Sequence, residues 1–149
     1  MALQVGDSAP DFASKDQHGN PVQLSGYRGK KVVLYFYPKD DTPGCTAQAC
    51  NLNENLPALQ KAGYEVIGVS VDDEKSHQKF INKYGLNFTL LADTDKQIVQ
   101  LYDLWKEKSM YGKKYMGTVR TTFLIDEKGI ITDIISKVDT AAHAEQILK

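Results

Sequence analysis

The chain has 149 residues, 42% of them hydrophobic and 25% charged, with a formal net charge of −1. This length predicts a single domain over residues 1–149 with a full hydrophobic core. A net charge this small argues against nucleic acid as the main partner. Because there is no apolar run of about 18 residues and no basic-then-apolar leader, we expect no membrane partner and a cytoplasmic protein.

The first half of the chain predicts a hairpin, a strand, a helix and a second strand. Turn-forming residues between short apolar pieces predict an N-terminal β-hairpin with its turn near residues 17–20. The apolar runs Val32–Tyr37 and Tyr64–Val71 predict buried strands. Between them we expect a helix from Pro43 to about Asn55, because Thr42 suits the N-cap and Pro43 the first helical position.

The second half alternates helices and strands. Helices are expected at Glu74–Tyr84, Lys96–Tyr102 and Ala141–Leu148, and strands at Phe88–Leu91, Val119–Asp126 and Ile130–Ser136. The segment Leu104–Gly117 is expected to be a solvated basic loop that carries Trp105, Tyr111 and Tyr115. This order of elements predicts an α/β fold with a central mixed sheet flanked by helices.

Both cysteines, Cys45 and Cys50, fall in the helix that follows the first core strand. Cys45 lies in its first turn, where free backbone N–H groups and the positive end of the helix dipole favour a thiolate. The preceding Gly44 removes side-chain bulk beside the sulfur. The alternative interpretation is that Cys45 is a small buried hydrophobic residue.

The spacing of the two cysteines indicates a conformational step. On an intact helix their Cα atoms would be roughly 8–9 Å apart, whereas a disulfide requires about 7 Å or less. The helix would therefore have to unwind, which the weak helix formers Asn51, Asn53 and Asn55 and the following Pro57 make feasible. His18, His77 and His143 are too scattered for a zinc site and are expected at the surface. No metal or cofactor is predicted.

The segment Tyr35–Asp40, followed by Thr42–Thr46, resembles the signature of the Q-type peroxiredoxins, also called bacterioferritin comigratory proteins, in their two-cysteine intramolecular form. The resemblance extends over nearly the whole chain, through Gly6 with Ala9–Phe12, Gly29-Lys30, Ile67–Ser70, Phe88–Asp93, Trp105, Tyr115–Gly117, Arg120 and Phe123–Asp126. It implies a thioredoxin-like fold and thiol-dependent peroxidase activity.

The resemblance also implies roles for individual residues. The pattern Pro-x-x-x-Thr-x-x-Cys matches Pro38, Thr42 and Cys45, and the distant arginine of the family matches Arg120. Cys45 would attack hydrogen peroxide or an organic hydroperoxide and become a sulfenic acid. The substrate would be bound by Thr42, Gly44, Cys45 and Arg120, and Cys50 matches the resolving cysteine that forms an intramolecular disulfide.

Where many relatives have glutamate, this chain has Gln48, which is a poor candidate for acid–base work. The expected reductant is thioredoxin, with glutaredoxin as the alternative. Intramolecular resolution favours a monomer. Two other functions stay open from the residues: a thioredoxin-like disulfide oxidoreductase, which usually needs Cys-x-x-Cys, and a non-enzymatic redox sensor.

Overall fold

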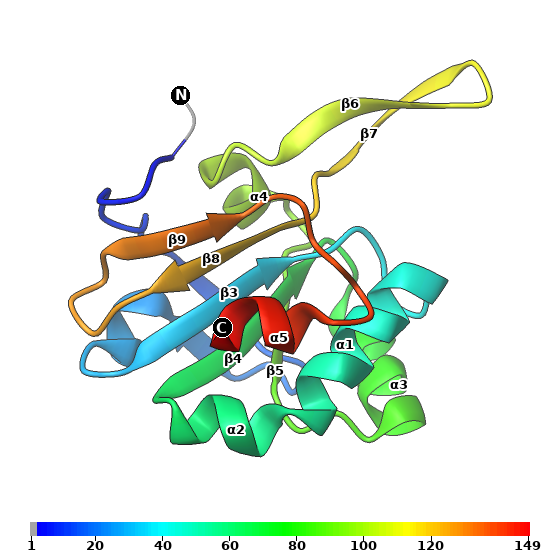
Figure 1. Ribbon diagram of the computed structural model, residues 1–149. Helices are drawn as coiled ribbons and strands as arrows, with labels where there is room; N and C mark the ends of the chain where they lie inside the picture. Colours follow the sequence, from blue (N-terminus) through cyan, green and yellow to red (C-terminus); the bar gives the residue numbers. More distant parts are fainter. Residues whose placement is uncertain (1–2) are drawn as a thin grey trace.

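The structure is a computed structural model that describes residues 3–149 (Figure 1). Its elements are β1 (Ala13–Lys15), β2 (Pro21–Gln23), the 3₁₀ helix η1 (Leu24–Tyr27), β3 (Lys31–Phe36), α1 (Pro43–Glu54), α2 (Leu56–Lys61), β4 (Tyr64–Ser70), α3 (Glu74–Tyr84), β5 (Thr89–Ala92), α4 (Gln97–Leu101), β6 (Trp105–Met110), β7 (Lys113–Thr118), β8 (Thr121–Ile125), β9 (Ile131–Ile135) and α5 (His143–Leu148). The predicted elements are confirmed within a few residues, except for the segment that contains β6 and β7.

A five-stranded sheet in the order β5-β4-β3-β8-β9 forms the centre of the molecule. Strands β3, β4 and β5 are parallel, because α1, α2 and α3 supply the crossovers between them. Strand β8 runs antiparallel to β3, and β9 antiparallel to β8. The sheet is therefore mixed, as predicted, and β3 lies in its middle.

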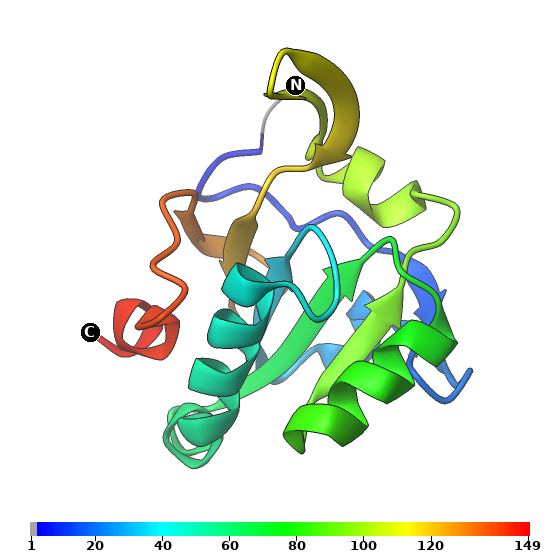
Figure 2. The same ribbon diagram turned by 90° about the vertical axis from the view of Figure 1, so that its right-hand side faces the viewer.

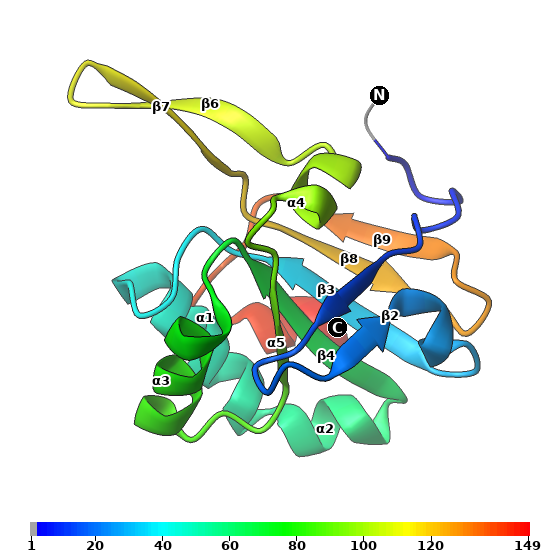
Figure 3. The same cartoon turned by 180° about the vertical axis from the view of Figure 1, so that it is seen from behind.

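Side chains that alternate along the buried strands form a separate core on each face of the sheet. Val32, Leu34 and Phe36 of β3 face the core that is covered by the N-terminal segment and α4. Val33 and Tyr35 face the other core, which α1, α2, α3 and α5 cover. Figures 2 and 3 show α1 and α3 on one side of the sheet and the β1–β2 hairpin on the other. Cys45 belongs to the helix-covered core.

The predicted loop Leu104–Gly117 is wrong, because most of this segment forms the antiparallel hairpin β6–β7 that projects from the body in Figure 1. Its turn residues Tyr111 and Gly112 both have positive φ, 54° and 77°, as the hairpin turn of type I′ requires. Sequence patterning could not reveal these strands, because most of their side chains are exposed and so no face alternates between apolar and polar.

The predicted surface position of the histidines is wrong for two of the three. His77 and His143 are 0% exposed, whereas His18 is exposed. Each buried ring has polar partners: His77 contacts the carboxylate of Asp40, and His143 contacts Thr122. Hydrogen bonding makes burial of a polar ring tolerable, and those partners are distant in the sequence. Within residues 3–149, no helix is long and apolar enough to cross a membrane.

Candidate active site

The site is built where β3 ends and α1 begins. Thr42 has an extended backbone (φ −97°, ψ 157°) at the N-cap, and Pro43 is the first helical residue. Cys45 therefore lies in the first turn of α1, as predicted. The Thr42 side chain does not cap the helix, because its hydroxyl donates a hydrogen bond to the Lys39 carbonyl at 2.9 Å. The N–H groups of the first turn thus lack a side-chain cap.

Strand pairing explains why Arg120, 75 positions after Cys45, reaches this turn. Phe36, the last residue of β3, pairs with Thr121, the first residue of β8. Arg120 therefore lies beside the point where the chain leaves β3 for α1. Its Nη2 donates a hydrogen bond to Cys45 Sγ at 3.3 Å. The contact therefore places a charged donor directly against the sulfur.

Gly44 makes room for this contact. A Cβ atom at this position would lie 3.3 Å from Arg120 Nη2, tighter than most real contacts of a Cβ. The glycine predicted to clear the sulfur thus also clears the guanidinium. Pro38 is half-buried in the loop that joins β3 to α1.

Gln48 is a site residue that the sequence reasoning set aside. Arg120 Nη1 donates to its Oε1 at 2.6 Å, so the guanidinium is held between Gln48 and Cys45. The Gln48 side chain is 0% exposed, and its Nε2 is buried without a hydrogen-bond partner in residues 3–149. One signal could have revealed it: Gln48 follows Cys45 by three residues and is the polar member of an otherwise apolar helix face.

The charge of Arg120 also acts on two other basic side chains. Burial, with a contribution from Arg120, lowers the pKa of His143, although a hydrogen bond to Gln146 opposes this. Burial and the positive charge of Arg120 also lower the pKa of Lys108, on β6. Arg120 is thus the cation in direct contact with Cys45, which is itself only 2% exposed.

Cys50 lies further along α1 and is partly exposed. Both thiols are free, so the structure describes the reduced state. Burial, followed by the charge of Glu54, raises the pKa of Cys50, and this keeps it a thiol. The two sulfurs therefore differ in environment: Cys45 faces a guanidinium and Cys50 does not.

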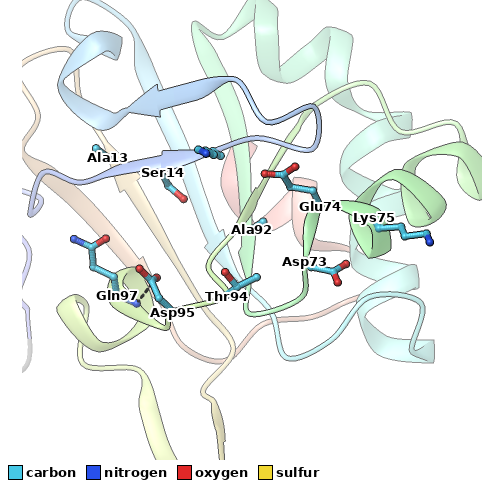
Figure 4. Close-up of a pocket in the computed structure, with 10 residues that line it drawn as sticks. Ala13, Ser14, Asp73, Glu74, Lys75, Ala92, Thr94, Asp95 and Gln97 are labelled. Atoms are coloured by element: carbon cyan, nitrogen blue, oxygen red, sulfur yellow. Dashed lines mark hydrogen bonds between the residues drawn. The ribbon is translucent and has the colours of Figure 1, made fainter.

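A hollow with a volume of about 630 Å³ lies away from this site. It is lined by residues of β1, the start of α3 and the segment after β5, among them Ser14, Glu74 and Asp95 (Figure 4). None of the predicted site residues lines it. Among residues 3–149, no three His, Cys, Asp or Glu side chains are grouped to hold a metal ion.

Comparison with known proteins identifies the family to which this fold belongs. The model of the AhpC/TSA family matches residues 5–134, which is most of the chain. The chain therefore belongs to the AhpC/TSA family. Its structural neighbours are peroxiredoxins: it matches a mutant of Xylella fastidiosa PrxQ with a TM-score of 0.93 and 34% identity, over 99% of this chain and 94% of that one.

Within the family, the similar proteins are of the Bcp and peroxiredoxin Q type. The putative peroxiredoxin bcp of Coxiella burnetii is 46% identical, over 99% of this chain and 98% of the relative. Peroxiredoxin Bcp of Escherichia coli is 44% identical, over 98% and 94%. A structure of Xanthomonas campestris peroxiredoxin Q matches with a TM-score of 0.86 and 40% identity, over 92% and 87%. The resemblance inferred from the motifs is confirmed: the chain is a thiol-dependent peroxidase.

Proposed function

We propose that Cys45 is the peroxidatic nucleophile and that its substrates are hydrogen peroxide and alkyl hydroperoxides. The observation that carries this is the 3.3 Å hydrogen bond from Arg120 Nη2 to Cys45 Sγ in the first turn of α1. A Xanthomonas campestris relative is described by its alkyl peroxide reduction activity, which supports the substrate class. The thiolate attacks the distal oxygen; an S–O bond forms and the O–O bond breaks. The leaving oxygen takes a proton and departs as water or an alcohol, and Cys45 becomes a sulfenic acid.

Negative charge develops on the leaving oxygen in this step and requires preorganised donors. Arg120 supplies them, because its guanidinium is fixed between Gln48 and Cys45. The backbone N–H groups of Gly44 and Cys45 and the Thr42 hydroxyl complete the substrate site. For Thr42 this requires its hydroxyl to turn from the Lys39 carbonyl toward the substrate. Pro38, which has no N–H, shields the pocket without competing for the thiolate.

Cys50 resolves the sulfenic acid. Its thiol attacks the Cys45 sulfur, an S–S bond forms, and the hydroxyl leaves as water with the thiol proton. On an intact helix the two Cα atoms would be roughly 8–9 Å apart, beyond the limit of about 7 Å for a disulfide. The first part of α1 therefore unwinds before the bond forms.

Thioredoxin is the proposed reductant, by thiol–disulfide exchange, with glutaredoxin as the alternative. A structural neighbour at 26% identity, a yeast mitochondrial one-cysteine peroxiredoxin, is described with glutathione and thioredoxin systems. We further propose that residues 1–149 act as one domain and that the protein works in the cytoplasm. We also propose that it is a monomer, because intramolecular resolution needs no thiol from a second chain.

The test is peroxide-dependent NADPH oxidation through thioredoxin reductase and thioredoxin. Cys45→Ser should abolish it, whereas Cys50→Ser should permit one round of oxidation and stop cycling. Full turnover by Cys45→Ser would exclude Cys45 as the nucleophile. Reduction of protein disulfides without peroxide would instead favour a disulfide oxidoreductase, and oxidation without turnover a redox sensor.

A further inference from the structure

The two halves of α1 are attached to the rest of the protein in different ways. Within residues 3–149, the side chains of its first half, residues 43–49, make hydrogen bonds to one residue only, Arg120, through Cys45 and Gln48. The second half, after Cys50, is bonded on two sides to other elements. This difference begins at Asn51, the residue that follows the second cysteine.

Asn51 connects α1 to the segment that begins α5. Its Nδ2 donates to the Ala141 carbonyl at 3.0 Å, and its Oδ1 accepts from the Ala144 N–H at 2.7 Å. Both ends of one carboxamide are thus bound to backbone groups about 90 residues away in the sequence. Figure 2 shows α5 beside α1. Neither partner group is a cysteine side chain, so neither is consumed when the thiols are oxidised.

Asn53 makes the same arrangement with the segment between α3 and β5. Its Nδ2 donates to the Gly85 carbonyl at 3.0 Å, and its Oδ1 accepts from the Asn87 N–H at 2.8 Å. Between the two asparagines, Leu52 is 0% exposed in the core. The two carboxamides, which we call the asparagine clamps, therefore fix the second half of α1 from two directions.

Oxidation of Cys45 acts on the first half alone. Cys45 is 2% exposed and its sulfur contacts Arg120 at 3.3 Å. A sulfenic acid adds an oxygen atom at this crowded position, and a close-packed interior does not absorb an extra atom without displacement. The strain falls on Arg120, which makes every side-chain hydrogen bond of that half. The asparagine clamps lie beyond Cys50 and are not affected directly.

We propose that Asn51 and Asn53 are positioning residues that stop the unwinding of α1 at Cys50. Residues 43–49 open and carry Cys45 toward Cys50, which stays attached to the clamped half of the helix. This inference rests on the proposed resolving role of Cys50. The proposal reverses the expectation that these asparagines weaken the helix. Relative to alanine, each asparagine lowers helix stability by less than about 1 kcal/mol, but its side chain makes at least two hydrogen bonds to backbone groups of other segments.

Hydrogen–deuterium exchange of the reduced and disulfide forms tests the boundary. In the disulfide form, amides of residues 46–53, whose helical acceptors lie in the opening segment or just before it, should exchange at least about a hundredfold faster than in the reduced form. Amides of residues 54–56 should change within about threefold. In Asn51→Ala/Asn53→Ala the fast exchange should extend through residue 56. Asn82→Ala, an exposed asparagine of α3, is the matched control and should keep the boundary. Each single variant should extend the exchange less than the double variant.

Equal exchange of residues 46–53 and 54–56 in the unmodified disulfide form would overturn the proposal, as would an unchanged boundary in the double variant. A mass measurement keeps this result separate from the resolving role of Cys50. If peroxide gives no loss of two hydrogens, Cys50 does not resolve Cys45. The disulfide is then made with diamide, which is reduced to its hydrazine, and the exchange boundary is tested on that product.

Discussion

At the scale of single residues, the site depends on how one guanidinium is held. Arg120 donates from two different nitrogens to Gln48 and Cys45, so its plane is fixed relative to the sulfur. A lysine in this place would offer one compact charge and could not hold both contacts in the same geometry. The direction of the donors, as well as the charge, is therefore part of the site.

The first prediction concerns this geometry. Arg120→Lys should slow oxidation of Cys45 by roughly a hundredfold, the order of effect seen when one preorganised donor is lost, although the charge is kept. Stopped-flow mixing with peroxide in a Cys50→Ser background measures this step alone. A rate within twofold of the parent would show that charge without direction is sufficient.

The second prediction concerns Gln48. Gln48→Ala removes the acceptor that fixes Arg120, and a hydrogen bond to a charged group is worth about 1.5–3 kcal/mol. Oxidation of Cys45 should therefore slow by about tenfold or more in the same assay. Gln78→Ala is the control, because Gln78 bonds to Gln17 on the far side of α3 and does not contact the site. Equal rates for the two variants would contradict the role of Gln48.

At the scale of elements, α1 must be stable enough to present Cys45 and weak enough to open. In its first half, the side-chain hydrogen bonds to other elements of the described chain are made with Arg120 alone, whereas Asn51 and Asn53 bond the second half to backbone groups of other segments. Helix propensity in residues 43–49 should therefore set how often Cys45 and Cys50 can meet. The resolving step should respond to substitutions there more than the peroxide step does.

Ala47→Gly tests this dependence. Glycine lowers helix stability by about 1 kcal/mol relative to alanine, so the open population, and with it the rate of disulfide formation, should rise about fivefold. Ala58→Gly in α2 makes the same change outside the opening segment and should leave that rate unaltered. Disulfide formation is followed by mass after one equivalent of peroxide. No acceleration by Ala47→Gly would mean that helix opening does not limit resolution.

Secondary-structure elements were predicted best from the sequence where residues close in the chain determine where the element begins and ends. Helix α3 forms at the predicted Glu74–Tyr84, because the Asp73 carboxylate accepts from the Ser76 N–H at its start and Gly85, with φ 64°, ends it. The β6–β7 hairpin was missed because its side chains bury little. The Gln48–Arg120 contact and the asparagine clamps were missed because each joins residues at least 32 positions apart, which local patterns do not register.

At the scale of the whole molecule, one buried ion pair connects the loop before the active-site helix to the rest of the fold. His77 Nε2 lies 2.9 Å from the Leu91 carbonyl, which can only accept, and Nδ1 lies 2.6 Å from the carboxylate of Asp40. Nε2 therefore donates, and with Asp40 ionised Nδ1 donates as well, an arrangement that favours the protonated ring. Tyr37 and Ser76 also donate to Asp40. The pair joins the β3–α1 loop to α3 and β5.

This pair makes stability depend on pH. Burial lowers the pKa of His77, but the hydrogen bond and charge of Asp40 outweigh it, and the net pKa is raised above 6.5. The folded state thus holds the proton more tightly than the unfolded chain. The stabilisation is full below pH 6.5 and is lost as the pH rises through the raised pKa. Each tenfold gain in proton affinity on folding contributes about 1.4 kcal/mol to it.

Urea unfolding between pH 6 and 9 measures this dependence. Asp40→Asn/His77→Leu removes both charges together, which avoids leaving one of them buried alone. Its free energy of unfolding should fall less over this range than that of the parent. Parallel curves for the two proteins would show that the His77 proton does not contribute.

The projecting hairpin has a practical consequence. Tyr111 at its tip is 97% exposed, while at its base the Val119 N–H bonds to the Leu104 carbonyl at 2.8 Å, just before Arg120. A peptide tag or a fluorophore inserted between Tyr111 and Gly112 would therefore be separated from the guanidinium by the length of the paired strands β6 and β7 and by the hydrogen bond at their base. We therefore expect that labelling or immobilising the enzyme at this tip will leave its thiol chemistry intact.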